Sequence, residues 1–225
     1  MRALAYIGLD QPETALGLLH ELEGFIAVSD TAQETVILLL GGYIFEYLEN
    51  KEEATRYFRQ VLAKSQDEYI TLSAGAGLWR QGKSLQAENL WLTGLAADAA
   101  PLTLIAKMRN HTSTVSHAPT LDKIIAQFLF DTSWLSEDSY HKNLTIARAH
   151  LAISINPDLD AAHMALAKWY LNANNISRAE THLNSINEDA PLALRRRLLQ
   201  LALAEETGKT AEVLANLNRE LTSNE

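Results

Sequence analysis

Cysteine is absent from this chain of 225 residues. Its absence excludes disulfides, a thiolate nucleophile and zinc sites built on cysteine. Apolar runs of the roughly 20 residues that a membrane-spanning helix needs are also missing. The opening segment reaches Asp10 before the apolar region of a signal peptide could form. We therefore expect a cytoplasmic location, or a periplasmic one if the chain is an N-terminally shortened form.

Helix-breaking residues are scarce as well. The chain has five prolines and ten glycines, and 47% of its residues are hydrophobic. Long uninterrupted segments dominated by alanine and leucine favour helices over strands. The composition predicts an all-α fold with a substantial core.

Positive charge is in deficit. The formal net charge is −9, and the largest basic cluster is the run Arg195, Arg196 and Arg197. A nucleic-acid backbone would be repelled by such a chain, so we expect no nucleic acid among its partners.

What the chain does have is a repeat of about 34 residues. Thr145, Ala179 and Val213 are each 34 residues apart, as are Pro157 and Pro191. A repeat of this length, with a small residue followed by a bulky one and a terminal proline, indicates stacked helix pairs. Small residues at matching places should let neighbouring helices approach closely. These packing positions are Gly42, Ala54, Gly75, Ala87 and Ala179, with Pro157 and Pro191 as terminal prolines.

The units resemble tetratricopeptide repeats, most clearly over 136–221 and well over 33–100. The order of the pieces is also similar to multi-repeat bacterial proteins of this family, of the alphaproteobacterial type and of unassigned function. The resemblance implies a right-handed α-α superhelical solenoid of about five to six helix pairs. It further implies a non-catalytic scaffold that binds a peptide or protein partner in a concave groove. The alternative is a structural or assembly segment of a longer solenoid or of a homo-oligomer.

The repeat is interrupted once. Ala87 and Thr145 are 58 residues apart, which is one repeat and about 24 residues more. We expect an N-terminal array over 1–100 with an incomplete first repeat, an irregular connector or hinge over 101–119, and a C-terminal array over 120–225.

In the family, the first helix of each pair lines the groove. The side chains that the resemblance places there are aromatic in the N-terminal half and mixed in the C-terminal half. Aromatic residues and arginine are frequent in binding hot spots, although the same side chains could instead pack between repeats. The family's clamp for a C-terminal carboxylate is absent. The groove candidates are Tyr43, Tyr47, Tyr69, Trp79, Arg80, Lys168, Asn172 and Arg195.

No motif for metal binding or catalysis is present. The seven histidines show no metal-ligand spacing. We expect those on helices, His141, His150, His163 and His182, to face solvent or cap helices. Serines and threonines of the connector lack a recognisable histidine and aspartate partner. We therefore expect no enzyme activity, no cofactor and no metal.

The N-terminal end suggests an interface. The first helix looks truncated, and the end of the array would then expose Leu4, Ile7, Leu16 and Leu19. Apolar faces of this kind are usually covered. The sequence therefore predicts contact with an upstream segment, with a partner, or with a second copy in a homo-oligomer formed through this end. The alternative is a frayed, marginally stable end.

Overall fold

The computed structural model describes residues 1–26, 30–65, 67–83, 85–87, 119–134, 142–186, 193–208 and 215. These residues form helices joined by turns, and no strand occurs among them. The all-α fold expected from composition is thereby confirmed. The chain divides into two compact units, Met1–Pro157 and Asp158–Glu225. Each unit is described by itself.

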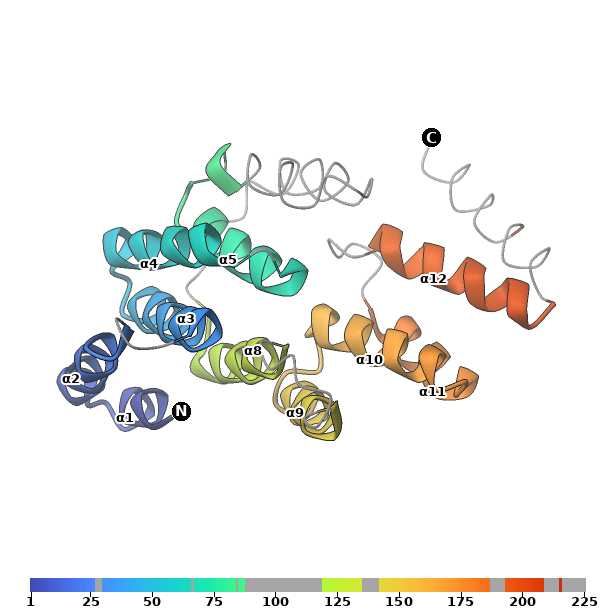
Figure 1. The fold of residues 1–225 in the computed structure, drawn as a ribbon, viewed down its shortest axis with the longest axis horizontal. Coiled ribbons are helices and arrows are strands. Elements are labelled where there is room, and N and C mark those ends of the chain that lie inside the picture. The colour runs from blue at the N-terminus through green and yellow to red at the C-terminus, as the bar shows by residue number, and fades with distance from the viewer. Residues whose placement is uncertain are drawn as a thin grey trace. The chain divides into compact units, whose positions relative to one another are not determined.

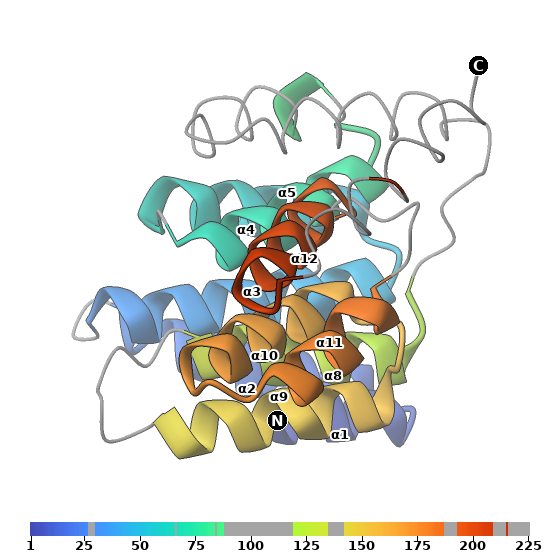
Figure 2. The same ribbon diagram turned by 90° about the vertical axis from the view of Figure 1, so that its right-hand side faces the viewer.

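The first unit contains helix pairs packed in sequence order (Figure 1). Helix α1 packs against α2, and α3 packs against α4, which in turn contacts α5. Figure 2 shows α3 and α4 lying side by side along their lengths. Helices α8 and α9 form a further pair. The helices are α1 (Arg2–Gly8), α2 (Pro12–Glu23), α3 (Thr31–Tyr47), α4 (Lys51–Lys64), α5 (Glu68–Arg80), α8 (Leu121–Trp134) and α9 (Lys142–Ile155).

The second unit follows the same plan. Helix α10 packs against α11, and α12 contacts both of them. The spans are α10 (Asp160–Asn172), α11 (Ile176–Ser185) and α12 (Ala193–Glu206).

Several helices begin at a side-chain cap. The carboxylate of Asp30 accepts a hydrogen bond from the backbone N–H of Gln33 at 2.8 Å, which starts α3. Asn50 and Asn175 do the same for α4 and α11. Pro12 occupies the first turn of α2, where its missing N–H leaves no hydrogen bond unmade. Each cap satisfies a donor that the helix itself cannot pair.

One turn recurs between the two helices of a pair. Its central residue has a positive φ of 56–78°, and the next residue donates its N–H to the carbonyl five residues back. The central residue itself donates its N–H to the carbonyl three residues back. These two hydrogen bonds define the Schellman turn, which ends a helix and reverses the chain. Glycine fits the left-handed conformation best. Among the described residues, four turns show the positive φ and both hydrogen bonds, and one of them has glycine at its centre. The central residues are Asp10, Glu49, Gly82 and Asn174.

The core of the first unit depends on close helix approach. A Cβ atom on Gly42 of α3 would lie 2.6 Å from the ring of Phe58, and one on Gly77 of α5 would lie 2.5 Å from the same ring. Phe58 of α4 is 0% exposed. The ring of Phe58 therefore fills the space between the three helices. This space is wide enough for the ring only because positions 42 and 77 are glycines.

The N-terminal end differs from its prediction. Leu4, Ile7 and Leu19 are 1%, 4% and 2% exposed, and Leu16 is half-buried. Helix α1 packs against both α2 and α8, so its apolar face is covered within the chain. The exposed apolar end predicted from these residues is wrong. A homo-oligomer formed through this end stays a prediction, and these four leucine and isoleucine side chains no longer support it.

The domain boundaries expected from the broken repeat are not tested, because residues 101–118 lie outside the described part of the chain. The division seen between compact units falls after Pro157 instead. Helix α8 belongs to the first unit, since it packs on α1, α3 and α5. Within the described ranges, no helix combines the length and apolarity needed to cross a membrane.

Candidate interaction groove

The first helices of the N-terminal pairs, α1, α3 and α5, share a face that is covered by another part of the same chain. Helix α8 packs against all three of them. In a repeat array these helices are the ones expected to line the binding groove. We call the surface formed by α1, α3 and α5 the first-helix groove. In this structure α8 occupies it.

Apolar side chains make most of the contact between α8 and the groove. Ile124 and Phe128 of α8 belong to the same buried cluster as residues of α1 and α3. The rings of Phe128 and Tyr43 meet edge to face, with centroids 6.4 Å apart. Near α1, a Cβ atom on Gly8 would lie 2.9 Å from the side chain of Leu121. Helix α8 thus fits the groove as closely as a core helix fits its neighbours.

A polar cluster lies in the middle of this apolar contact. Asp131 of α8 is 0% exposed, and its carboxylate accepts hydrogen bonds from Tyr43 Oη at 2.5 Å and Ser73 Oγ at 2.9 Å. Gln127 Nε2, one turn earlier on α8, donates to the same carboxylate at 2.9 Å and to Ser73 Oγ at 3.0 Å. The cluster joins α3, α5 and α8 through residues as far as 88 positions apart. We call Tyr43 and Ser73 the hydroxyl pair of the groove.

Burial changes the proton affinity of this cluster. Desolvation raises the pKa of Asp131 to about 6, although the hydrogen bonds from Tyr43, Gln127 and Ser73 lower the pKa in part. Desolvation, followed by the charge of Asp131, also raises the pKa of Tyr43 well above its ordinary value. Tyr43 therefore stays neutral and acts as a donor to the carboxylate.

A separate ion pair holds α3 to α5. Arg80 Nε lies 2.6 Å from Glu46 Oε1 and its Nη2 lies 2.8 Å from Oε2, so the pair is bidentate. Gln81 donates a third hydrogen bond to Glu46 at 2.9 Å. The Glu46 side chain is 1% exposed and that of Arg80 is 28% exposed. Desolvation on its own would lower the pKa of Arg80, but the charge and hydrogen bonds of Glu46 outweigh it and raise the pKa.

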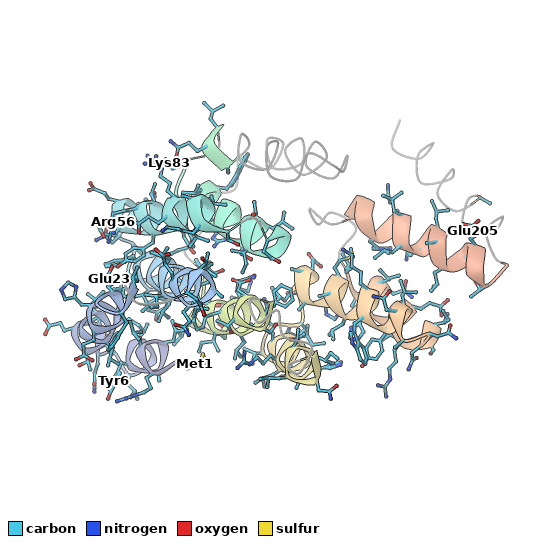
Figure 3. The ribbon with its side chains drawn as sticks, in the orientation of Figure 1. Met1, Tyr6, Glu23, Arg56, Lys83 and Glu205 are labelled. Carbon is cyan, nitrogen blue, oxygen red and sulfur yellow. The ribbon has the colours of Figure 1, made fainter. Side chains whose placement is uncertain are left out.

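A second link joins α2 to α4. The Tyr57 hydroxyl donates a hydrogen bond to the carboxylate of Glu23, which is labelled in Figure 3. Tyr57 also stacks on Phe45 with ring centroids 5.4 Å apart. Neighbouring helix pairs are therefore connected through side chains that do not belong to α8.

The groove candidates have different positions in the structure. Tyr43 is 1% exposed, so it contacts the chain's own α8 and offers no free surface to a partner. Arg80 is engaged by Glu46. Trp79 is half-buried and packs against the core cluster. Tyr47 is 36% exposed.

Arg80 also has a structural role. Its loss would leave the carboxylate of Glu46 buried and unpaired, so an alanine variant of Trp79 and Arg80 should lose stability as well as any partner contact.

In the second unit, Lys168 is half-buried and Asn172 is exposed, both on α10. The side chains of Tyr69 and Arg195 lie outside the described part of the structure. Those two stay predictions.

The small residues of the repeat are interior. Ala54, Ala87 and Ala179 are each 0% exposed, and Gly42 and Gly75 are buried. Pro157 is exposed after α9, and Pro191 lies outside the described residues. Gly77 of α5 is a further close approach, since it meets the ring of Phe58 of α4.

Two histidines that the sequence placed at the surface are buried together. His163 of α10 is 6% exposed and His182 of α11 is 8% exposed, with their Nδ1 atoms 3.1 Å apart. The ring of Tyr170 stacks on His182 with centroids 5.5 Å apart. The expectation that both histidines face solvent or cap helices is wrong. No group of three or more metal-ligating side chains occurs among the residues that the structure describes.

A polar hollow of about 820 Å³ lies beside the beginning of α4. Four basic side chains line it together with Glu52 and Glu53. Two of the basic side chains are engaged within the chain, since Arg56 pairs with Glu53 and Arg59 bonds to Gln86. Glu53 offsets the charge of Arg56, whereas the neutral amide of Gln86 leaves the charge of Arg59 in place. The basic residues of the hollow are Lys51, Arg56, Arg59 and Lys83.

Neither the protein-family models nor the curated proteins include a match to this chain. Among solved structures, it is similar to the crystal structure of PilW, described as a widely conserved type IV pilus biogenesis factor. The two chains are 18% identical, and the TM-score is 0.38 over 98% of this chain and 90% of that one. Nothing about the function of this chain follows from a likeness of that degree.

Proposed function

We propose that this chain is a non-catalytic protein-protein interaction scaffold that recognises a helical segment in its first-helix groove. The observation that carries the proposal is the placement of α8 across α1, α3 and α5. The groove accommodates a helix of the chain itself, which supports recognition of a helix from a partner.

The chemistry of the groove suits helix recognition. A helix in a groove is recognised by apolar anchors repeated every three or four residues, with specificity from a few polar contacts. Ile124 and Phe128 supply such anchors on α8, and the hydroxyl pair supplies the polar contact to Asp131. Repeat arrays use the same kind of surface for partners because it is concave and continuous across neighbouring units.

Occupancy by α8 sets a condition on binding. A partner in the groove must replace α8, whereas a partner on the exposed rim need not. Tyr47, at the end of α3, is exposed and stays a candidate rim contact, and Asn172, exposed on α10, stays a separate candidate in the second unit. The alternative function is a structural or assembly segment, in which the contacting molecule is a second copy or a neighbouring part of a longer solenoid.

Site-specific photo-crosslinking tests the proposal. A photoreactive phenylalanine analogue at Tyr47 reports on the groove rim, and the same analogue at Arg59, exposed on α4, is the matched control. Crosslinking in the native cell should join a different protein to position 47 and not to position 59. The captured protein, once purified, should bind the isolated chain with a saturable signal.

Two results would count against the scaffold. Equal crosslinking from both positions would show non-specific contact. Crosslinks that join only copies of this chain, together with a molecular mass that rises with concentration, would favour the assembly function.

A further inference from the structure

The contacts that hold α8 differ from those that hold the groove together. The repeats are joined by Arg80 with Glu46, by Tyr57 with Glu23, and by Phe58 packed against glycines of α3 and α5. None of these contacts includes a residue of α8. The groove frame therefore keeps its own connections when α8 is not counted.

The groove contacts of α8 follow a helical pattern. Leu121, Ile124 and Phe128 meet the groove at intervals of three and four residues, and Asp131 follows three residues later. This spacing places all four residues along one side of the helix. Helix α9 packs against α8. Thr145 Oγ1 of α9 donates a hydrogen bond to the backbone carbonyl of Ser133, near the C-terminal end of α8. Helix α8 thus meets the groove as a ligand helix meets a receptor.

The hydroxyl pair gives the groove a chemical preference. Tyr43 and Ser73 both donate to the carboxylate of Asp131, and both are almost fully buried, at 1% and 8% exposure. A helix without an acceptor at this point would leave two buried hydroxyl groups unpaired. A helix with a carboxylate there would be held by two charge-assisted hydrogen bonds.

We propose that α8 is an exchangeable occupant of the first-helix groove, and that the natural ligand is a partner helix of the same chemistry. That helix has apolar side chains at intervals of three and four residues and a carboxylate three residues after an aromatic ring. This inference rests on the proposed function and names the class of partner.

Tethering explains why the groove is closed in the free chain. A covalently linked helix has an effective concentration of about a millimolar, so a free helix at micromolar concentration competes at a disadvantage of about a thousandfold. A partner replaces α8 by making more contacts, or after the hold of α8 has been weakened. Binding in trans is therefore measured best in a chain whose own α8 is loosened.

The test uses the full chain and a fluorescent peptide spanning residues 119–134. Fluorescence anisotropy measures its binding to the wild-type chain and to the Phe128→Ala variant, which loses the ring that meets Tyr43. The variant should bind the peptide at least tenfold more tightly than the wild type. Circular dichroism and the urea midpoint show whether the variant is folded.

Specificity for the carboxylate is tested with matched peptides. A peptide carrying Asp131→Ala should bind the Phe128→Ala chain about tenfold or more weakly than the parental peptide, because two hydrogen bonds to a charged group are lost. Adding Tyr43→Phe and Ser73→Ala to the chain should make the two peptides bind equally. Equal binding of both peptides to the unmodified groove would overturn the proposal.

A second variant keeps the test decisive if Phe128→Ala fails to fold. The chain has no cysteine, so Gly8→Cys with Leu121→Cys introduces one unique pair at the place where a Cβ atom on residue 8 would lie 2.9 Å from the side chain of Leu121. Oxidation should lock α8 to α1 and reduce peptide binding at least tenfold, and reduction should restore it. Peptide binding that is equal in both redox states would show that the peptide does not replace α8.

The outcomes separate this inference from the scaffold proposal. Absence of saturable peptide binding to both folded variants overturns the exchange of α8, while a partner crosslinked at Tyr47 still supports a scaffold that uses its rim. A stable dimer of the wild-type chain that the peptide dissociates would also overturn the proposal, in favour of exchange of α8 between copies.

Discussion

Arg80 and Glu46 form a bidentate ion pair between two helices, and they are 34 residues apart in the chain. Tyr57 and Glu23 are also 34 residues apart and also bond to each other. This separation is close to one repeat, so each pair joins a helix pair to the next one along the chain. The bonded positions are not equivalent within their helices, because the turn residues Asp10, Glu49 and Gly82 are 39 and 33 residues apart. The first pair joins first helices, and the second joins second helices.

The first prediction concerns Arg80. Arg80→Ala should lower the free energy of unfolding of the first unit by about 3 kcal/mol, because the buried carboxylate of Glu46 would lose its charged partner. Arg56→Ala is the matched control, since the pair of Arg56 with Glu53 is largely exposed and should contribute about 0.5 kcal/mol or less. Urea unfolding followed by circular dichroism measures both. Equal midpoints for the two variants would contradict the structural importance of the buried pair.

The second prediction concerns Gly77. A methyl group at this position would lie 2.5 Å from the ring of Phe58, so Gly77→Ala should destabilise the first unit by about 1–3 kcal/mol. Gly17 lies in α2, where a methyl group would meet no other atom within 4 Å, so Gly17→Ala should stabilise by about 0.5–1 kcal/mol. Thermal unfolding of the two variants should therefore shift in opposite directions. A further change of Phe58 to leucine should recover part of the loss at Gly77.

The third prediction concerns the turns between paired helices. Gly82 has φ 78° with free space around it, so Gly82→Ala should cost about 1 kcal/mol through backbone strain alone. Glu49 has φ 57° in the equivalent turn, where Glu49→Gly relieves the same strain. The gain should stay at or below about 1 kcal/mol, because glycine also raises the entropy of the unfolded chain. Destabilisation by Glu49→Gly would show that the Glu49 side chain contributes more than its backbone conformation costs.

The sequence predicted the helix pairs because their physical causes are local. A period of 34 residues and small residues such as Ala54 and Ala179 depend only on which residues lie near each other along the chain. The turns were harder to recognise, since Asp10, Glu49 and Asn174 adopt a conformation that glycine usually marks.

The occupant of the groove could not be predicted in the same way. Tyr43 lies on the expected face of the expected helix, but a sequence pattern does not distinguish a partner from a distant part of the chain. Its contact with Asp131 spans 88 residues and depends on where α8 packs. His163 and His182 were missed for a similar reason, since their contact joins two helices at no characteristic spacing. The acid that follows the apolar run Phe128–Phe130, in line with the apolar positions 124 and 128, is the sequence signal that marks α8 as a specific contact.

The last prediction concerns pH and Asp131. The pKa of Asp131 is about 6 in the folded chain and near the ordinary value of 3.8 when unfolded. Between these values the folded state binds more protons than the unfolded state, so stability falls as pH rises from about 4 to about 6 and then levels off. A difference of about two pKa units corresponds to about 3 kcal/mol.

Asp131→Asn removes this titration while it keeps an acceptor and a similar shape. The wild-type free energy of unfolding minus that of Asp131→Asn should therefore decrease by about 2 kcal/mol from pH 4 to pH 7. Asp122, exposed in the first turn of α8, is the matched control, because a hydrogen bond from Thr120 lowers its pKa. The contribution of Asp122 is lost as pH falls, so the wild type minus Asp122→Asn should change in the opposite direction. Urea unfolding at a series of pH values measures both differences. A difference for Asp131→Asn that is constant across this range would mean that the carboxyl group does not stay buried in the groove.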